Sequence, residues 1–214
     1  MLFRSDLLPI LAETLSPFDN VTVIPGDAMK LDLAALAAQQ FPGLTPLACA
    51  NLPYNITTPV ITALIEAGCF ASITVMIQRE VAKRICAGPG TRDYGAFSLF
   101  CQYYTTPEYL FEVPPECFLP APKVTSAVIR MVPRAEPAQT LVEDAFFFRV
   151  VRASFAQRRK TLLNGLSAAF GDKLGKDQLR QAIADAGLPE GVRGEKLGIP
   201  EFAALAQALQ ALGS

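Results

Sequence analysis

The sequence predicts an α/β fold followed by a small all-helical region. Up to about residue 133, short apolar runs rich in β-branched residues alternate with stretches whose apolar residues recur at helical spacing. Such alternation is typical of a parallel sheet that helices cover on both faces. Beyond that point only helical periodicity remains, and a proline-containing stretch at 133–137 marks the change. The 214 residues are 51% hydrophobic, enough for a substantial core, and we expect two domains, 1–135 and 136–214.

Each element is predicted from its own apolar pattern and from the capping residues or prolines at its ends. The expected helices of the first region are 6–15, 31–41, 57–67, 79–85 and one that begins near 94. The expected strands are 21–24, 47–51, 72–78, 109–113 and 124–132, the last two as an antiparallel pair. The expected helices of the second region are 142–155, 160–170, 176–186 and 200–212.

Composition excludes several kinds of chemistry. The chain has no histidine, which rules out histidine general bases and the usual metal clusters. Its five cysteines are irregularly spaced in apolar surroundings, so we expect buried reduced thiols and neither disulfides nor a metal site. No apolar run approaches the ~20 residues that span a bilayer, and the N-terminus lacks a signal-peptide pattern. We expect a cytoplasmic monomer with no membrane contact.

The stretch Asn51-Leu52-Pro53-Tyr54 ends a predicted buried strand, where open α/β sheets bind their ligands. The exocyclic amine of adenine is a poor nucleophile because its lone pair is delocalised into the ring, so a site must accept its N–H bonds. The Asn51 amide oxygen and a carbonyl of Leu52 or Pro53 can accept them, and the Tyr54 ring can stack on an extruded base. A turn with a capping Asn and a packed Tyr explains the same four residues equally well.

Asn51 to Tyr54 resembles a motif of the ribosomal RNA adenine N6,N6-dimethyltransferases, and three further stretches resemble later motifs of that family in the expected order. These stretches are residues 118–126, 158–162 and 192–197. The resemblance runs from about Asp6 to about Leu209. It implies a class I (Rossmann-like) methyltransferase sheet with S-adenosylmethionine as methyl donor. It also implies dimethylation of adenine N6 in ribosomal RNA of the small ribosomal subunit, a step of ribosome biogenesis.

The resemblance also implies roles for single residues. Phe118, in a proline-rich connection, would form the second wall of a base pocket that Tyr54 begins, although a Phe between prolines is more often a core plug. Asp27, Ala28 and Asn51 would bind S-adenosylmethionine, although a lone Gly-Asp pair such as Gly26-Asp27 more often simply forms a turn.

Basic residues gather between Ala145 and Gly171, where no acidic residue stands. We expect them to contact RNA phosphates, although a solvated helix face is the ordinary explanation for scattered charges. The loop at 87–93 faces the RNA in the family, and a plain surface connection accounts for any single residue in it equally well. The predicted RNA-binding residues are Lys123, Arg149, Arg152, Arg158, Arg159 and Lys160.

One family feature is missing from these residues. Before Gly43 the only glycine is Gly26, so the glycine-rich turn that holds the cofactor in class I methyltransferases is absent. The chain resembles a family member without its first βαβ unit, and we expect these 214 residues to bind S-adenosylmethionine weakly. Two alternatives stay open. One is a DNA adenine methyltransferase, which Leu52 and the helical tail disfavour, and the other is a non-catalytic RNA-binding or ribosome-assembly factor.

Overall fold

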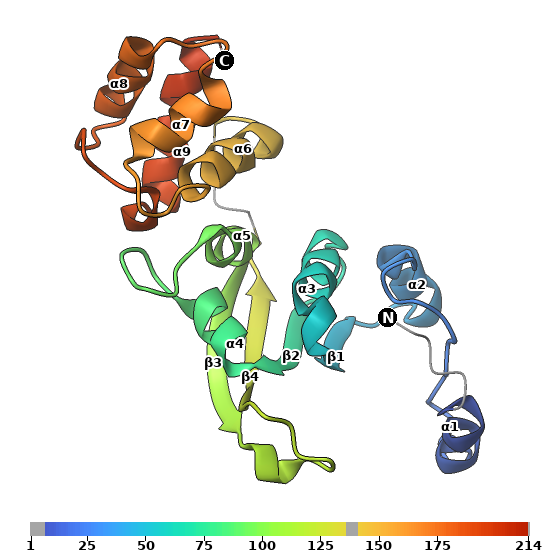
Figure 1. The fold of residues 1–214 in the computed structure, drawn as a ribbon. Helices are drawn as coiled ribbons and strands as arrows, with labels where there is room; N and C mark the ends of the chain where they lie inside the picture. Colours follow the sequence, from blue (N-terminus) through green and yellow to red (C-terminus); the bar gives the residue numbers. More distant parts are fainter. Residues whose placement is uncertain (1–6, 136–140, 214) are drawn as a thin grey trace.

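The computed structural model describes residues 7–135 and 141–213. Figure 1 shows a sheet with flanking helices in one half of the molecule and a cluster of helices in the other. The helices of the second half follow the last strand, as the sequence predicts. Residues 6 and 136, where the first helix and the second domain were predicted to begin, lie outside the described residues.

The sheet is mixed and has the strand order β1-β2-β4-β3. β1 (Leu47–Asn51) pairs in parallel with β2 (Ser72–Gln78), and β2 pairs antiparallel with β4 (Ser126–Pro133). β4 also pairs antiparallel with β3 (Thr105–Val113), which confirms the predicted antiparallel pair. As a result, the carboxyl ends of β1, β2 and β3 meet the beginning of β4 at one end of the sheet.

Helices cover only one face of this sheet in the described residues, whereas the sequence predicts helices on both faces. Along β2, Ile73, Val75 and Ile77 are fully buried beneath α3 (Thr57–Glu66), α4 (Arg79–Cys86) and α5 (Ala96–Tyr104). The alternate residues on the opposite face, such as Thr74, are only partly buried, and Arg130 of β4 is exposed. Within the described residues the expected second layer of helices is therefore absent.

The N-terminal segment is loosely attached to the sheet. α1 (Leu8–Leu15) buries none of its residues, whereas α2 (Leu33–Gln40) is capped by Asp32 and lies beside α3 in Figure 1. The strand predicted at 21–24 is wrong, because this segment pairs with no described strand and its Val21 side chain is 43% exposed. A β-strand needs a hydrogen-bonded neighbour, and the apolar pattern alone cannot supply one.

The cysteines only partly match their prediction. All five are free thiols, but Cys49 and Cys117 are exposed and Cys101 alone is fully buried. Cys49 lies on an edge strand and Cys117 on the connection between β3 and β4, so the apolar residues next to them in the sequence do not enclose them.

The helical half has a core of its own. It consists of α6 (Asp144–Phe155), α7 (Leu162–Phe170), α8 (Lys176–Asp185), α9 (Ile199–Ala211) and the short 3-10 helix η4 (Gly194–Lys196). α5 joins the two halves, because its Leu99 belongs to the helical core and its Cys101 to the sheet core. At the same joint, the Asp144 carboxylate accepts hydrogen bonds from the hydroxyls of Tyr103 and Tyr104, each at 2.7 Å. No helix in the described part of the chain is long and apolar enough to cross a membrane.

Candidate active site

A cavity of about 290 Å³ lies at the carboxyl end of β1. Its walls come from the junction between β1 and α3 and from the connection between β3 and β4. The lining residues are Asn51, Leu52, Pro53, Tyr54, Phe118, Pro120 and Pro122. All five predicted catalytic residues therefore surround one space. Its volume lies just below the usual range for small-molecule sites, about 300–1,000 Å³, and suits a single planar group.

The structure distinguishes the hydrogen-bond acceptors of this cavity. Asn51 is the exposed last residue of β1, and its side-chain amide has no hydrogen-bond partner among the described residues. The Leu52 N–H donates to the Met76 carbonyl at 3.0 Å and extends the parallel ladder, while no donor in the described chain reaches the Leu52 carbonyl. The Pro53 carbonyl is already occupied, since it accepts from the backbone N–H of the third residue after it and from the Thr57 hydroxyl, both at 3.2 Å. Asn51 and Leu52 are therefore the available acceptors.

Two aromatic rings line the same cavity from different segments. Tyr54 begins a 3-10 turn (Tyr54–Ile56), and its hydroxyl lies 2.8 Å from Oγ of Ser126, the buried first residue of β4. Phe118 follows the 3-10 turn Pro115–Cys117 in a connection stiffened by prolines, and its ring is half-buried. Ser126 has no role in the sequence-based prediction, although it stands in the resembling stretch 118–126. Its hydrogen bond fixes the Tyr54 ring at the cavity wall.

The predicted cofactor residues are not brought together. The half-buried Asp27 carboxylate accepts from the Met29 N–H at 3.1 Å within its own turn. Ala28 lines a different cavity, of about 360 Å³, between α2 and α3, and Asn51 is not among the residues of that cavity. The loop of Asp27 is not anchored to the sheet because the segment before it is not a strand. The described residues therefore do not fit S-adenosylmethionine as a complete pocket.

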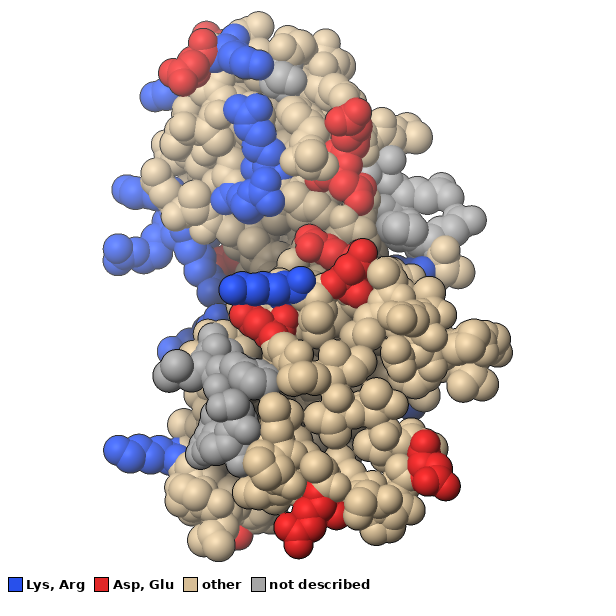
Figure 2. Space-filling view, turned by 90° about the vertical axis from the view of Figure 1, so that its right-hand side faces the viewer, with Lys and Arg blue, Asp and Glu red and all other residues tan. Residues whose placement is uncertain are grey.

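The predicted RNA-binding residues fall into two groups. The Arg149 guanidinium lies 4.5 Å from the centroid of the Phe170 ring and donates to the Ala169 carbonyl at 3.1 Å, and Arg158 is bonded to Glu195 at 2.9 Å. The other four are exposed, and their side chains form no hydrogen bond or ion pair within the described residues. They are Lys123, Arg152, Arg159 and Lys160. Figure 2 shows Lys and Arg side chains gathered along one edge of the helical half, at the left of that view.

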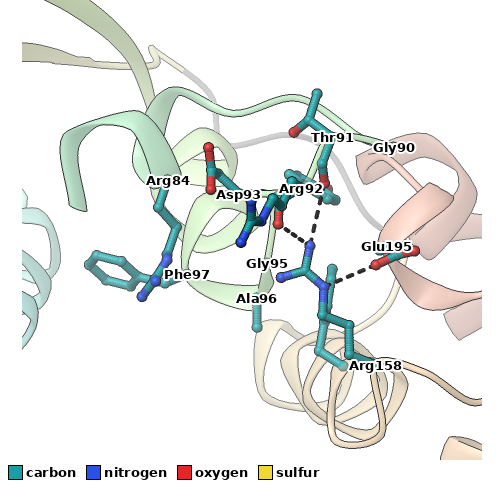
Figure 3. Close-up of a pocket in the computed structure, with 12 residues that line it drawn as sticks. Arg84, Gly90, Thr91, Arg92, Asp93, Gly95, Ala96, Phe97, Arg158 and Glu195 are labelled. Atoms are coloured by element: carbon teal, nitrogen blue, oxygen red, sulfur yellow. Dashed lines mark hydrogen bonds and ion pairs between the residues drawn. The ribbon is translucent and has the colours of Figure 1, made fainter. Parts of the chain in front are cut away.

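A second and larger cavity, of about 950 Å³, lies where the two halves meet. Its lining comes from α4, the loop at 88–95, the start of α5, the end of α6 with the nearby Arg158, and η4. Figure 3 shows these residues. The Tyr94 side chain is buried at this loop and donates its hydroxyl to the Leu197 carbonyl at 3.0 Å. Burial, with a smaller effect of the Glu201 charge, raises the pKa of Tyr94 to about 12. The residue that follows the loop at 87–93 is therefore fixed to the helical half.

Comparison with known proteins gives a consistent result. Residues 3–210 match the family model described as ribosomal RNA adenine dimethylase. The ribosomal RNA small subunit methyltransferase A of Streptococcus pneumoniae strain JJA is 50% identical over 219 aligned positions, which cover 100% of this chain and 75% of the relative. The corresponding protein of strain Hungary19A-6 is 49% identical over the same coverage.

Two solved structures share the fold. A dimethyladenosine transferase from Plasmodium falciparum superposes with a TM-score of 0.78 at 21% identity, over 99% of this chain and 81% of that one. The 23S rRNA methyltransferase ErmE superposes with a TM-score of 0.66 at 24% identity, over 97% of this chain and 80% of that one. These similarities confirm the predicted methyltransferase-type α/β fold with a helical C-terminal part.

Proposed function

The chain belongs to the ribosomal RNA adenine dimethylase family, and on this premise we propose that it dimethylates N6 of adenine in small-subunit ribosomal RNA in the cytoplasm. The observation that supports this best is the single cavity shared by Asn51, Leu52, Tyr54 and Phe118 at the carboxyl end of β1. S-adenosylmethionine is the methyl donor of the family, and it supplies an already activated methyl group.

The aromatic rings bind the target base. Tyr54 and Phe118 line one cavity of about 290 Å³, and neither ring makes a ring contact with another described aromatic residue. Both are therefore available for stacking on an adenine extruded from the RNA. Each such stacking contact is worth about 1–3 kcal/mol. The stiff connection around Phe118 and the hydrogen bond of Tyr54 to Ser126 limit the entropy lost when the base enters.

The hydrogen-bond acceptors of the cavity activate the N6 amine of the target adenine. The Asn51 amide oxygen and the Leu52 carbonyl lie at the cavity without competing donors among the described residues, so they can accept the two N6–H bonds of the bound adenine. This interaction localises the lone pair on N6 as the nitrogen becomes pyramidal. Among the residues that the structure describes, no carboxylate, lysine or arginine lines this cavity. These residues thus act by position and hydrogen bonding and not as a general base.

The helical half and the adjoining connection bind the RNA backbone. Lys123, Arg152, Arg159 and Lys160 are exposed and free of described acidic partners, so their charges are available to phosphates. Arg149 and Arg158 already have partners inside the protein. We therefore assign residues 136–214 to RNA binding and residues 1–135 to catalysis, with Lys123 as a further RNA contact from the catalytic region.

The test is transfer of a labelled methyl group to a small-subunit rRNA fragment and, in parallel, to duplex DNA. We expect transfer to the RNA alone. Transfer to DNA in preference would favour a DNA adenine methyltransferase. RNA binding without transfer, at a donor concentration shown by titration to saturate the chain, would favour a non-catalytic RNA-binding protein.

A further inference from the structure

The cavity between the two halves has a charged lining with an excess of arginine over acidic residues. Arg84 of α4, Arg92 of the loop at 88–95, and Arg158 all lie on its walls, together with Asp93 and Glu195. Figure 3 shows the Arg84 and Arg92 side chains on one side of this space and Arg158 turned toward the loop and Glu195. The three arginines are not equivalent, because their partners differ.

Arg158 uses its guanidinium inside the protein. Its Nε donates to the Glu195 carboxylate at 2.9 Å, and its Nη2 donates to the carbonyl of Thr91 at 3.4 Å and to the carbonyl of Arg92. The Glu195 side chain is only 18% exposed. The hydrogen bond from Arg158 lowers the pKa of the Glu195 carboxyl below its ordinary value, and the charge of Arg193 acts in the same direction. The pair is therefore charged and directional at neutral pH.

Glu195 itself is held in place by close packing. A Cβ on the preceding residue, Gly194, would lie 2.6 Å from the Ser154 carbonyl oxygen, so η4 can approach α6 this closely only with glycine there. The Glu195 carbonyl accepts from the Gly90 N–H at 2.7 Å. The loop is thus connected to η4 through its backbone at Gly90 and to Arg158 through two of its carbonyls.

Arg84 and Arg92 have no such partners. Both side chains are exposed, line the cavity and form no ion pair with any described acidic residue. A guanidinium that has no partner in the protein, is open to solvent and lines the same cavity as a second one is suited to a phosphate group. Arg158 donates hydrogen bonds to the backbone carbonyls of Thr91 and of Arg92 itself. The position of Arg92 therefore depends on Arg158.

We propose that this cavity binds the RNA backbone through Arg84 and Arg92, and that Arg158 is a positioning residue that holds the loop for them and does not itself bind phosphate. The inference rests on the proposed function, because its ligand is a phosphodiester of the RNA substrate. It replaces the direct contact that the sequence predicts for Arg158, adds a contact at Arg84, and names Arg92 as the residue that binds RNA in the loop expected to face it.

The first experiment measures the affinity of the chain for an rRNA fragment at several salt concentrations. Arg158→Lys keeps the positive charge but cannot donate in three fixed directions, so it should weaken binding as much as Arg158→Gln, by about 10- to 100-fold. Glu195→Gln should also weaken binding, because it disturbs the loop. Arg158→Lys affinity within about twofold of wild type, or tighter binding by Glu195→Gln, would overturn the positioning role, since both results are expected of a direct phosphate ligand.

Arg159 provides the matched control, because it is the next residue, is exposed and has no described partner. Arg159→Lys should bind nearly as the wild type does, whereas Arg159→Gln should lower the salt slope by about 0.7–0.9, the change for one phosphate contact. The double variant Arg84→Gln/Arg92→Gln should lower the slope by about 1.5 on the same scale. An unchanged slope in the double variant would remove the cavity from the RNA-binding surface.

A third measurement needs no RNA and separates this inference from the proposed function. Hydrogen exchange of the backbone amides at 88–93, and trypsin cleavage after Arg92, should both become faster in Arg158→Lys and Glu195→Gln and stay unchanged in Arg159→Gln. If the wild type fails to bind rRNA while this pattern holds, the proposed function is wrong and the positioning role stands. Equal exchange in Arg158→Lys and wild type would refute the positioning role whatever the RNA does.

Discussion

Replacing Asn51 with alanine removes one acceptor from the base cavity and little else. The side chain is exposed, and its amide has no partner among the described residues, so the substitution leaves neither an internal void nor an orphaned buried group. Surface changes of this kind alter the free energy of unfolding by at most about 0.5 kcal/mol. For a chain of 214 residues this lowers the Tm by at most about 2 °C.

The effect on methyl transfer should be much larger. The Asn51 oxygen accepts an N6–H bond that strengthens as the nitrogen becomes pyramidal, so the interaction stabilises the transition state more than the bound substrate. Removing one preorganised hydrogen-bonding group of this type lowers kcat by about 10²–10³, or about 2.7–4 kcal/mol. The Leu52 carbonyl remains and holds the other N–H bond, so we expect RNA affinity within about threefold of the wild type.

The assay is single-turnover methyl transfer to an rRNA fragment, with the methyl donor raised until the rate no longer depends on it. RNA affinity is measured separately by titration. Asn55→Ala is the matched control, since Asn55 is an exposed amide in the same loop that does not line the cavity. An Asn51→Ala rate within about threefold of the wild type would refute the acceptor role. An equal loss of rate and RNA affinity would show a ground-state contact instead.

Three further predictions concern the supports of the site. Tyr54→Phe keeps the stacking ring, so it should weaken RNA binding only slightly, but it should destabilise the fold by about 1–3 kcal/mol, because the buried Ser126 hydroxyl loses its 2.8 Å partner; a large loss of affinity without a lower Tm would contradict this. Gly165→Ala should lower the free energy of unfolding, measured in urea, by about 1–3 kcal/mol, because the new Cβ would lie 2.5 Å from a carbonyl oxygen of α6. An unchanged midpoint of urea unfolding would show that α7 can move away from α6 without loss of stability. Since Arg158 lowers the pKa of Glu195 below its ordinary value of 4.5, the stability that this pair adds should be fully present above about pH 4.5 and lost as the pH falls through the lowered pKa. The difference in unfolding free energy between the wild type and Glu195→Gln should therefore shrink under acid, and a constant difference would exclude the pair as its source.

The local pattern of apolar and polar residues was sufficient to predict most of the secondary structure. The strand at 72–78 and the helix after it are predicted with the bounds of β2 and nearly those of α4, because their periodicity is strong and their ends carry clear signals. The segment at 21–24 has an equally good β-branched composition but no neighbour to pair with. Pairing is a tertiary property, so composition could not separate these two cases.

The same division applies to the sites. Asn51 and Tyr54 could be predicted because chemistry and position coincide in four consecutive residues, and Phe118 because it stands in a second resembling stretch. The partner of Arg158 could not be predicted, because Glu195 is distant in the sequence and reaches it only through the packing of η4 against α6. A cluster of positive charges in the sequence does not reveal which members are already neutralised by the fold.

The two halves must keep a fixed relation for a single RNA to engage both. Lys123 lies on the connection that walls the base cavity, whereas Arg159 and Lys160 follow α6 in the helical half. The acidic residues at the joint serve this relation. Asp144 binds two tyrosines of α5, and Glu195 orients Arg158, which donates to two carbonyls of the loop at 88–95. Each is a charge-assisted interaction between segments far apart in the sequence, and such bonds are directional as well as strong. An overall charge of −1 is therefore compatible with RNA binding, because part of the acidic charge is used within the joint while exposed cations remain available to phosphate.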